Sequence, residues 1–314
     1  MAVGAGDGLS GGRPLEGIIG ACLTPWAEDG SVDGDRLGEL LDFMVGHCDA
    51  VSILGVEASE YRALSGADRR AWLRRGIAQV AGRVPVLAGA SSPRVAEVIE
   101  LAELAAAAGA DYAQVLIPRR PWGPEAGTAE LVRYFAQVAD ASPLPLIVYH
   151  NPTRGSDPPI EAFLRLAEVD GVAGFKESSR DIAKIGRLID TLPRGVQYFT
   201  TMQPLLASLL VGGAGAMMPV PATLLGARLM AAYRAGDLEA AAGWQRRFGV
   251  FPATWATYGL TPIMRVALRH LGLDIGGSTP PFAEVSPEHD AQIAAFLAEV
   301  GLEGAARAHA VEAS

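Results

Sequence analysis

The stretch GVAGFKESSRD, residues 171–181, holds one of only two lysines in a chain with 26 basic residues. Lys176 closes an apolar run, whereas Lys184 falls in a segment with helical periodicity and is expected to be a solvated surface charge. A desolvated ammonium can lose its proton and become a nucleophilic amine, which a guanidinium cannot do. Lys176 is therefore predicted to attack a ketone and form an imine. The alternative is a structural ion pair between Lys176 and Glu177 or Asp181.

A second candidate group lies in LPLIVYHNPTRG, residues 144–155, where Tyr149 comes near the end of another apolar run. A phenol can accept and return protons while an imine forms and while carbon–carbon bonds form or break. Arg154 follows on a loop where a guanidinium could bind a carboxylate. Each residue also has an ordinary interpretation, a packed tyrosine and a surface arginine. The combination with Lys176 favours chemistry on a 2-oxo acid.

Short apolar runs alternate with longer segments of helical periodicity along most of the chain. The runs are residues 17–25, 50–55, 84–90, 111–118, 144–150, 171–177, 196–201 and 213–220. They are apolar throughout and do not alternate with polar residues, as in parallel strands that are covered on both faces. This order predicts an α/β protein, a (β/α)8 TIM barrel, in which residues at the carboxyl ends of the strands face the active site.

The pattern becomes purely helical after Gly236, which predicts a C-terminal helical extension packed on the barrel or on a neighbouring subunit. The predicted parts of the chain are a flexible N-terminal tail (1–14), the barrel (15–235), the helical extension (236–303) and a flexible C-terminal tail (304–314). A doubly wound open sheet is the alternative, because GGAGAM at residues 212–217 resembles a glycine-rich phosphate loop. That segment precedes a strand-like run, however, where a dinucleotide-binding loop would follow one.

Composition restricts the classes of function. Half of the residues are hydrophobic and 19% are charged, which predicts a large core. A net charge of −9 disfavours nucleic acid or an anionic membrane as a partner. The N-terminus lacks the features of a signal peptide and no apolar run could span a bilayer, so the cytoplasm is the expected location. Cys22 and Cys48 are expected to be reduced and buried, and no metal-binding spacing is present.

Five segments share their order and spacing with a known family of enzymes. They are GIIGACLTPWAEDGSVD, GVEASEYRALS, GRVPVLAGAS, IVYHNPTRG and GFKESSRD. The first resembles the family pattern G-x-x-x-A-x-x-T-P-F-x-x-D-G-x-x-D, the fourth resembles Y-N-x-P-x-R, and the fifth resembles G-x-K-(E/D)-x-(S/T)-x-D. Over roughly residues 17–300 the chain is thus similar to the dihydrodipicolinate synthase / N-acetylneuraminate lyase family of pyruvate-dependent aldolases.

The resemblance implies roles for the candidate residues. Lys176 would form the Schiff base with the 2-oxo acid, Tyr149 would shuttle the proton, and Arg154 would bind a substrate carboxylate. The family uses no metal or organic cofactor, so none is expected. Its members are homo-oligomers, which implies a dimer or a dimer of dimers for this chain.

The loop after the second run departs from the family pattern. The family has a threonine pair here, which binds the carboxylate and relays protons, whereas this chain offers Glu57 and Ala58. The resemblance implies that backbone N–H groups around Ala58 and Ser59 hold the pyruvyl carboxylate, and that Met217 lines the pyruvyl pocket. A relaying hydroxyl could come only from Ser59. Glu57 either lies beside the pocket or pairs with Arg62.

The loop after the fourth run departs as well, because Arg119 and Arg120 stand where the synthase has a tyrosine pair. Arg120 is predicted to bind substrate, and pairing with acidic neighbours is the alternative. We expect a Schiff-base lyase or synthase that acts on pyruvate or another 2-oxo acid, with an aldehyde as co-substrate or product, and that differs from the lysine-pathway dihydrodipicolinate synthase. The alternatives are a 2-keto-3-deoxy sugar-acid dehydratase or hydratase-aldolase that uses the same lysine, and a non-catalytic protein that binds a 2-oxo acid.

Overall fold

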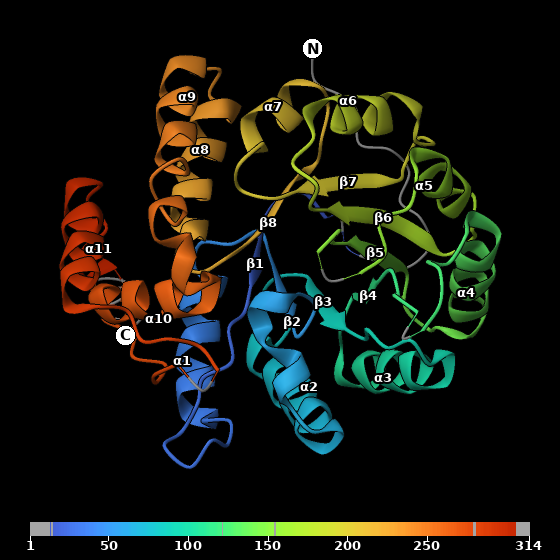
Figure 1. Ribbon diagram of the computed structural model, residues 1–314, viewed down its shortest axis with the longest axis horizontal. Helices are drawn as coiled ribbons and strands as arrows, with labels where there is room; N and C mark the ends of the chain where they lie inside the picture. The colour runs from blue at the N-terminus through green and yellow to red at the C-terminus, as the bar shows by residue number, and fades with distance from the viewer. Residues whose placement is uncertain (1–12, 14, 121, 154, 279–280, 306–314) are drawn as a thin grey trace.

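The computed structural model describes most of the chain (Figure 1), namely residues 13, 15–120, 122–153, 155–278 and 281–305. The predicted tails therefore lie outside the described residues except for Arg13, Gly304 and Ala305. Arg13 forms an ion pair with Asp111, with 2.9 Å between Nε and Oδ1. The limits of the two tails stay predictions.

Parallel strands form a closed barrel in which each strand pairs with the next and β8 pairs with β1. The strands are β1 (Gly17–Ala21), β2 (Ala50–Ile53), β3 (Val86–Gly89), β4 (Tyr112–Leu116), β5 (Leu146–His150), β6 (Val172–Glu177), β7 (Gln197–Thr200) and β8 (Gly215–Pro219). Each strand lies inside one of the apolar runs. The predicted TIM barrel is confirmed, and the open sheet is excluded.

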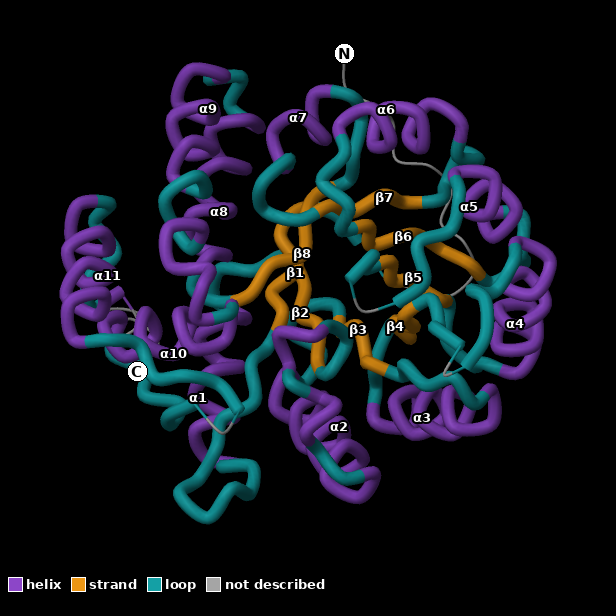
Figure 2. The backbone as a smooth tube through the Cα atoms, viewed as in Figure 1, coloured by secondary structure: helices purple, strands orange, loops and turns teal. Residues whose placement is uncertain are grey.

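Helices surround the barrel on its outer face (Figure 2). They are α1 (Gly34–Val45), α2 (Gly66–Val80), α3 (Val95–Ala108), α4 (Thr128–Ala141), α5 (Ile160–Ala167), α6 (Ile182–Thr191), α7 (Leu205–Leu210) and α8 (Ala222–Arg234). None of the helices in the described part of the chain is both long and apolar enough to cross a membrane.

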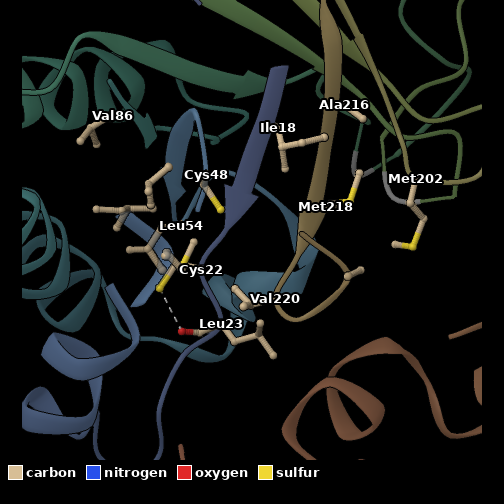
Figure 3. Close-up of a cluster of buried hydrophobic side chains, with 14 of the residues drawn as sticks. Ile18, Cys22, Leu23, Cys48, Leu54, Val86, Met202, Ala216, Met218 and Val220 are labelled. Carbon is tan, nitrogen blue, oxygen red and sulfur yellow. Dashed lines mark hydrogen bonds between the residues drawn. The ribbon is translucent and has the colours of Figure 1, made fainter. Parts of the chain in front are cut away.

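Alternation along the strands divides the core into two parts. Ile18 and Met218 belong to the large cluster between strands and helices, part of which is drawn in Figure 3. Their neighbours Ile19 and Met217 belong to a smaller cluster inside the barrel. The same alternation places Tyr149 in the interior cluster. Only every second residue of a strand therefore points into the barrel, and the residues between them face the helices.

Both cysteines belong to the outer cluster, as Figure 3 shows. Cys22 and Cys48 are free and buried, in agreement with the prediction from sequence. The Cys22 thiol donates a hydrogen bond to the carbonyl oxygen of Leu23, at 3.4 Å.

Further helices follow the barrel, as predicted: α9 (Leu238–Arg247), α10 (Leu260–Leu271) and α11 (Pro287–Glu299), with a 3₁₀ helix, η3 (Ala253–Tyr258), between the first two. α9 packs along α8, and α10 packs against α11 on the same side of the barrel (Figure 1). α10 also contacts the loop after β2. In that contact Arg265 of α10 pairs with Glu60, with 2.5 Å between Nη2 and Oε2, and each side chain is only 4% exposed.

This buried ion pair is supported by further hydrogen bonds. Arg265 donates to the carbonyl oxygen of Thr24 at 2.6 Å, and the indole N–H of Trp26 donates to Glu60 at 2.9 Å. A charge that is removed from water needs such partners. The ion pair therefore fixes the loop after β2 against the helical extension.

We expect the substitution Arg265→Met to lower the free energy of unfolding by about 3–5 kcal/mol, because it leaves the Glu60 carboxylate buried and unpaired. Urea-induced unfolding measures this change. Arg269→Met on the same helix is the matched control: its guanidinium is half exposed and pairs with Asp290 at the surface, so about 1 kcal/mol or less is expected. Equal losses in the two variants would contradict the assigned role of the buried pair.

Candidate active site

Tyr149 and Lys176 lie side by side at the carboxyl ends of two neighbouring strands, because β5 and β6 pair with an irregular register. Leu146 pairs with Val172, but the next residue, Ile147, pairs with Gly174, so β6 carries one extra residue. If the register continued regularly from the Leu146–Val172 pair, Tyr149 would oppose Phe175, and Lys176 would face the helices. The irregularity brings both side chains to the interior of the barrel.

Gly174 allows the backbone of β6 to lie close to that of the next strand, β7. A Cβ atom at this position would lie 2.7 Å from the carbonyl oxygen of Gln197 on the neighbouring strand β7. Any larger residue would push β6 away from β7, since a backbone carbonyl cannot move aside as a flexible side chain can. The glycine two residues before Lys176 therefore helps to set the position of the lysine.

The Lys176 amine is almost completely withdrawn from solvent. The residue is 5% exposed, and its Nζ atom lies 4.6 Å from the centroid of the Tyr149 ring and donates a hydrogen bond to Ser178 Oγ. Burial lowers the pKa of Lys176 to about 7, against the opposing effect of the Glu177 carboxylate. About half of the amine is then unprotonated at neutral pH. The ion pair with Glu177 or Asp181 that the sequence left open is not formed.

The Tyr149 hydroxyl has a partner suited to a proton shuttle. Asn151 Nδ2 donates a hydrogen bond to it at 2.9 Å, and the tyrosine is 2% exposed. Burial raises the pKa of Tyr149, while the hydrogen bond from Asn151 works in the opposite direction. The phenol is consequently protonated at neutral pH, and Asn151 would stabilise the phenolate when the proton is given away.

A pocket of about 370 Å³ opens above these two residues. It is lined by Ala21, Val56, Glu57, Ala58, Tyr149, Asn151, Pro152, Thr153, Lys176, Ser178, Ser179, Arg180, Thr201, Met202, Gln203, Met217, Met218, Pro219 and Leu260. A larger hollow of about 540 Å³ lies over α9, between residues such as Trp244 and Arg247, and contains neither candidate group. We place the site in the smaller pocket, because it contains the buried amine.

The loop after β2 forms one wall of the pocket. It contains the 3₁₀ turn η1 (Glu57–Ser59), where Glu57 and Ala58 line the cavity and Ser59 is fully buried away from it. The backbone N–H of Ser59 already donates to the carbonyl oxygen of Val56, at 3.0 Å. Glu57 satisfies both interpretations, since it lines the pocket and also lies 3.1 Å from Arg62 Nε. The Ser59 hydroxyl is thus not positioned as a relay in this structure.

The arginine predictions have different outcomes. Arg119 and Arg120 pair with Glu125 and Glu130, which is the alternative considered from the sequence, and neither is among the described residues that line the pocket. A substrate role for Arg120 stays a prediction without support from this pocket. Arg154 lies outside the described residues.

A charged network lies behind the site, between the barrel and its helices. Glu177 is fully buried; its Oε1 lies 2.7 Å from His150 Nδ1, and its Oε2 accepts a hydrogen bond from Tyr198 at 2.9 Å. Burial alone would raise the pKa of Glu177, but hydrogen bonds from His150 and Ser179 outweigh it and lower the pKa to about 2. Glu177 is therefore a permanent negative charge next to Lys176 in sequence.

The prediction for Lys184 is wrong. Its side chain is 11% exposed, and Nζ lies 3.5 Å from Asp157, 3.7 Å from Glu177 and 4.6 Å from the ring centroid of Phe163. Helical periodicity could not reveal this, because the partners come from β6 and from the region of α5. Lys184 belongs to the network behind the site and lies outside the pocket.

The pH dependence of imine formation should report the pKa of Lys176. The rate with pyruvate is expected to rise with pH and to be half-maximal near pH 7, because only the free amine attacks. Glu177→Gln should move this midpoint to lower pH, since it removes the charge that favours the ammonium. Glu168→Gln, at an exposed surface ion pair, should leave the midpoint unchanged.

Borohydride quenching followed by mass spectrometry measures these rates. A midpoint close to the ordinary lysine value in the unaltered protein would contradict the burial argument. An upward shift in Glu177→Gln would contradict the assigned effect of the carboxylate.

The sequence did not single out several residues of the pocket. Ser178 could have been predicted as a pocket residue. It follows Lys176 by two residues, and alternation along a strand places residues with this spacing on the same face. Asn151 could have been predicted in the same way, because it follows Tyr149 by two residues. Leu260 had none, since it reaches the pocket from the start of α10 in the helical extension.

The chain is similar to known proteins over most of its length. The model of the dihydrodipicolinate synthetase family matches residues 14–300. A 4-hydroxy-tetrahydrodipicolinate synthase of Leptothrix cholodnii is 31% identical over 296 residues, which cover 92% of this chain and 99% of that protein.

Solved structures are similar as well. A putative dihydrodipicolinate synthetase from Pseudomonas aeruginosa is 28% identical, with a TM-score of 0.82 over 91% of this chain and 99% of its own. YagE from E. coli K12, a protein of the dihydrodipicolinic acid synthase family solved in complex with pyruvate, is 26% identical, with a TM-score of 0.83 over 92% of this chain and 100% of its own. N-acetylneuraminate lyase from Mycoplasma synoviae, at 23% identity and a TM-score of 0.78 over 90% of this chain and 97% of its own, shares the fold.

Proposed function

The chain belongs to the dihydrodipicolinate synthetase family and is a lyase of that family. We propose that its Lys176 forms a Schiff base with pyruvate or another 2-oxo acid. The observation that carries the proposal is the buried Lys176 amine, which lies 4.6 Å from the ring centroid of Tyr149. A protein that merely bound a 2-oxo acid would gain nothing from an amine whose pKa is lowered to about 7.

The proposed reaction begins when the Lys176 amine attacks the carbonyl carbon of the 2-oxo acid. The Tyr149 phenol gives its proton to the hydroxyl of the resulting carbinolamine, which leaves as water, and Asn151 stabilises the phenolate. The iminium withdraws electrons, so that a carbon–hydrogen or a carbon–carbon bond of the neighbouring carbon can break. The Tyr149 phenolate accepts the proton that is released from this carbon, or from the hydroxyl group of the fragment that leaves as an aldehyde. The enamine that forms can then attack an aldehyde, which is the same step in reverse. Hydrolysis of the imine releases the product.

We further propose that aspartate semialdehyde, the aldehyde of the lysine pathway, is a poor substrate. The proposal rests on the loop after β2, where Glu57 and Ala58 replace the hydroxyl pair of the family and the buried Ser59 does not line the pocket. Loss of a proton relay typically costs roughly 10²–10⁴ in rate. The competing assignment comes from the relatives, several of which bear the name 4-hydroxy-tetrahydrodipicolinate synthase.

Condensation assays with pyruvate decide between the two assignments. For aspartate semialdehyde we expect a kcat/KM below about 10⁴ M⁻¹ s⁻¹, the lower end of the usual range for enzymes. Hydroxylated aldehydes are the comparison set, because their hydroxyl groups could bind to the polar wall of the pocket. Efficient condensation with aspartate semialdehyde would instead assign the lysine-pathway reaction to this chain.

A sugar-acid dehydratase that uses the same lysine is the second candidate. Hydroxyl and amide groups along the outer wall of the pocket favour it, because they could hold the hydroxyl groups of such a substrate: Thr153, Ser178, Ser179, Thr201 and Gln203. Detection of a dehydrated product without release of an aldehyde would support this reaction over aldol cleavage.

Homo-oligomeric assembly and a cytoplasmic location are part of the same proposal. The apolar side chains of Trp122, Leu210 and Val211 are at least half exposed, which fits surfaces that are buried between subunits. Sedimentation of the purified protein tests the assembly, and a monomer at working concentrations would contradict it. Cell fractionation tests the location.

A further inference from the structure

Arg180 lies on the rim of the pocket, in the loop between β6 and α6. Its residue is exposed, and it forms no ion pair or hydrogen bond with any described residue. The carboxylate next to it in sequence, Asp181, is already engaged: its side chain caps α6 by accepting hydrogen bonds from the backbone N–H groups of Ala183 and Lys184. A guanidinium is thus held at the pocket without a counter-ion among the residues described.

The backbone of Arg180 is unusual. Its φ is +64°, in the left-handed region that a residue with a side chain rarely adopts. Glycine would adopt this conformation without strain, so the arginine side chain is retained at a cost to the fold. Strain of this kind at a pocket points to a use for the side chain.

The charges of the pocket wall favour an anion at this position. Among the described lining residues, the only carboxylate is that of Glu57, and this group is paired with Arg62. Lys176 and Arg180 contribute the positive charge, and the charge of Arg180 adds to the larger effect of burial in lowering the pKa of the Lys176 amine. The first carboxylate of a 2-oxo acid must lie close to Lys176, next to the carbon that the amine attacks. The Arg180 guanidinium remains free for a second acidic group.

We propose that Arg180 binds a second anionic group, a carboxylate or a phosphate, at the end of the substrate farthest from Lys176. The substrate or product would then be a 2-oxo diacid or a phosphorylated 2-oxo acid. This inference rests on the proposed function, because it requires the first end of the substrate to be held as an imine on Lys176. It assigns substrate binding to an arginine that lines the pocket, whereas Arg120, the arginine predicted to bind substrate, pairs with Glu130.

Three 2-oxo acids with six-atom main chains test the inference. Two of them, which we call the anionic probes, end in a second anionic group: 2-oxoadipate and its phosphonate analogue 2-oxo-5-phosphonopentanoate. The third, 2-oxohexanoate, ends in an uncharged methyl group. Each is incubated with the full-length protein, and the imine is trapped with borohydride and quantified by mass spectrometry as a function of probe concentration. Pyruvate is run in parallel. The readout is the ratio of half-saturating concentrations between an anionic probe and 2-oxohexanoate within one protein, so that changes in lysine reactivity cancel.

The variants are Arg180→Gly and Arg180→Gln. Arg180→Gly removes the guanidinium and relieves the left-handed backbone, so its melting temperature should equal or exceed that of the unaltered protein. Arg187→Gln is the matched control, because Arg187 is an exposed arginine of α6 that does not line the pocket.

We expect the unaltered protein and Arg187→Gln to prefer an anionic probe about 10- to 100-fold, the range of a charge-assisted hydrogen bond. Both Arg180 variants should lose this preference, and the more strongly preferred anion identifies carboxylate or phosphate. Equal binding of all three probes by the unaltered protein, or a preference that survives in Arg180→Gly, would overturn the inference. If neither pyruvate nor any of the three probes is trapped, the proposed function fails, and the inference fails with it. If pyruvate is trapped without any anion preference, the inference alone fails.

Discussion

Replacing Lys176 by methionine is expected to abolish turnover of every 2-oxo acid, with a loss on the order of 10⁴–10⁶ in kcat, as for removal of other covalent nucleophiles. Methionine has a similar length and is apolar, so it should fill the space beside Tyr149 without loss of packing. The fold should survive, because a buried ionisable group is replaced by one that needs no hydrogen bond. The loss of activity can then be attributed to the missing amine.

Lys184→Met is the matched control for this substitution, since it removes the only other lysine of the chain. Lys184 belongs to the charged network between the barrel and its helices and does not line the pocket, so imine formation should persist in the variant. Circular dichroism would establish that both variants are folded. Appreciable turnover in Lys176→Met, above about 1% of the unaltered rate, would be incompatible with a covalent mechanism at this residue.

The substitution Tyr149→Phe is expected to lower kcat by roughly 10²–10⁴, because it removes the proton donor for the departing hydroxyl and keeps the ring. Binding of the 2-oxo acid should suffer much less, since Lys176 and the polar wall of the pocket remain. The expected signature is therefore a large fall in kcat with a small change in KM. Steady-state kinetics with the 2-oxo acid that the unaltered protein turns over fastest provides this measurement.

Tyr134→Phe serves as the control for Tyr149→Phe. Tyr134 donates a hydrogen bond to the carbonyl oxygen of Ser92 and does not line the pocket, so kcat should change little. Near-normal turnover in Tyr149→Phe would reduce Tyr149 to a packing residue. Proton transfer would then have to be assigned to another group.

The barrel could be predicted from sequence because its signal is local. Each strand is a short run that is apolar on both faces, and each helix has one apolar face, so order alone indicates eight repeated units. The proximity of Tyr149 and Lys176 follows from the same rule, since both end neighbouring strands. The extra residue of β6 that aligns them could not be predicted, because it depends on the pairing of strands and on the close contact at Gly174.

Long-range contacts account for the predictions that failed or gained no support. Lys184 has the spacing of a surface residue, but side chains from other elements surround it. Arg120 follows a strand, as a site residue would, but it forms an ion pair with Glu130 in α4. Leu260 comes from the helical extension, and nothing in its local sequence indicates a pocket residue. In each case the side chain position depends on residues far away in the chain.

Covalent capture of a 2-oxo acid would show directly whether the Lys176 amine is the nucleophile. The protein is incubated with pyruvate, the imine is reduced with borohydride, and the digested peptides are analysed by mass spectrometry. We expect one reduced pyruvyl group, carried by the peptide that contains Lys176, and no label in the Lys176→Met variant. A label found only on Lys184, or no label with any 2-oxo acid, would contradict nucleophilic attack by Lys176.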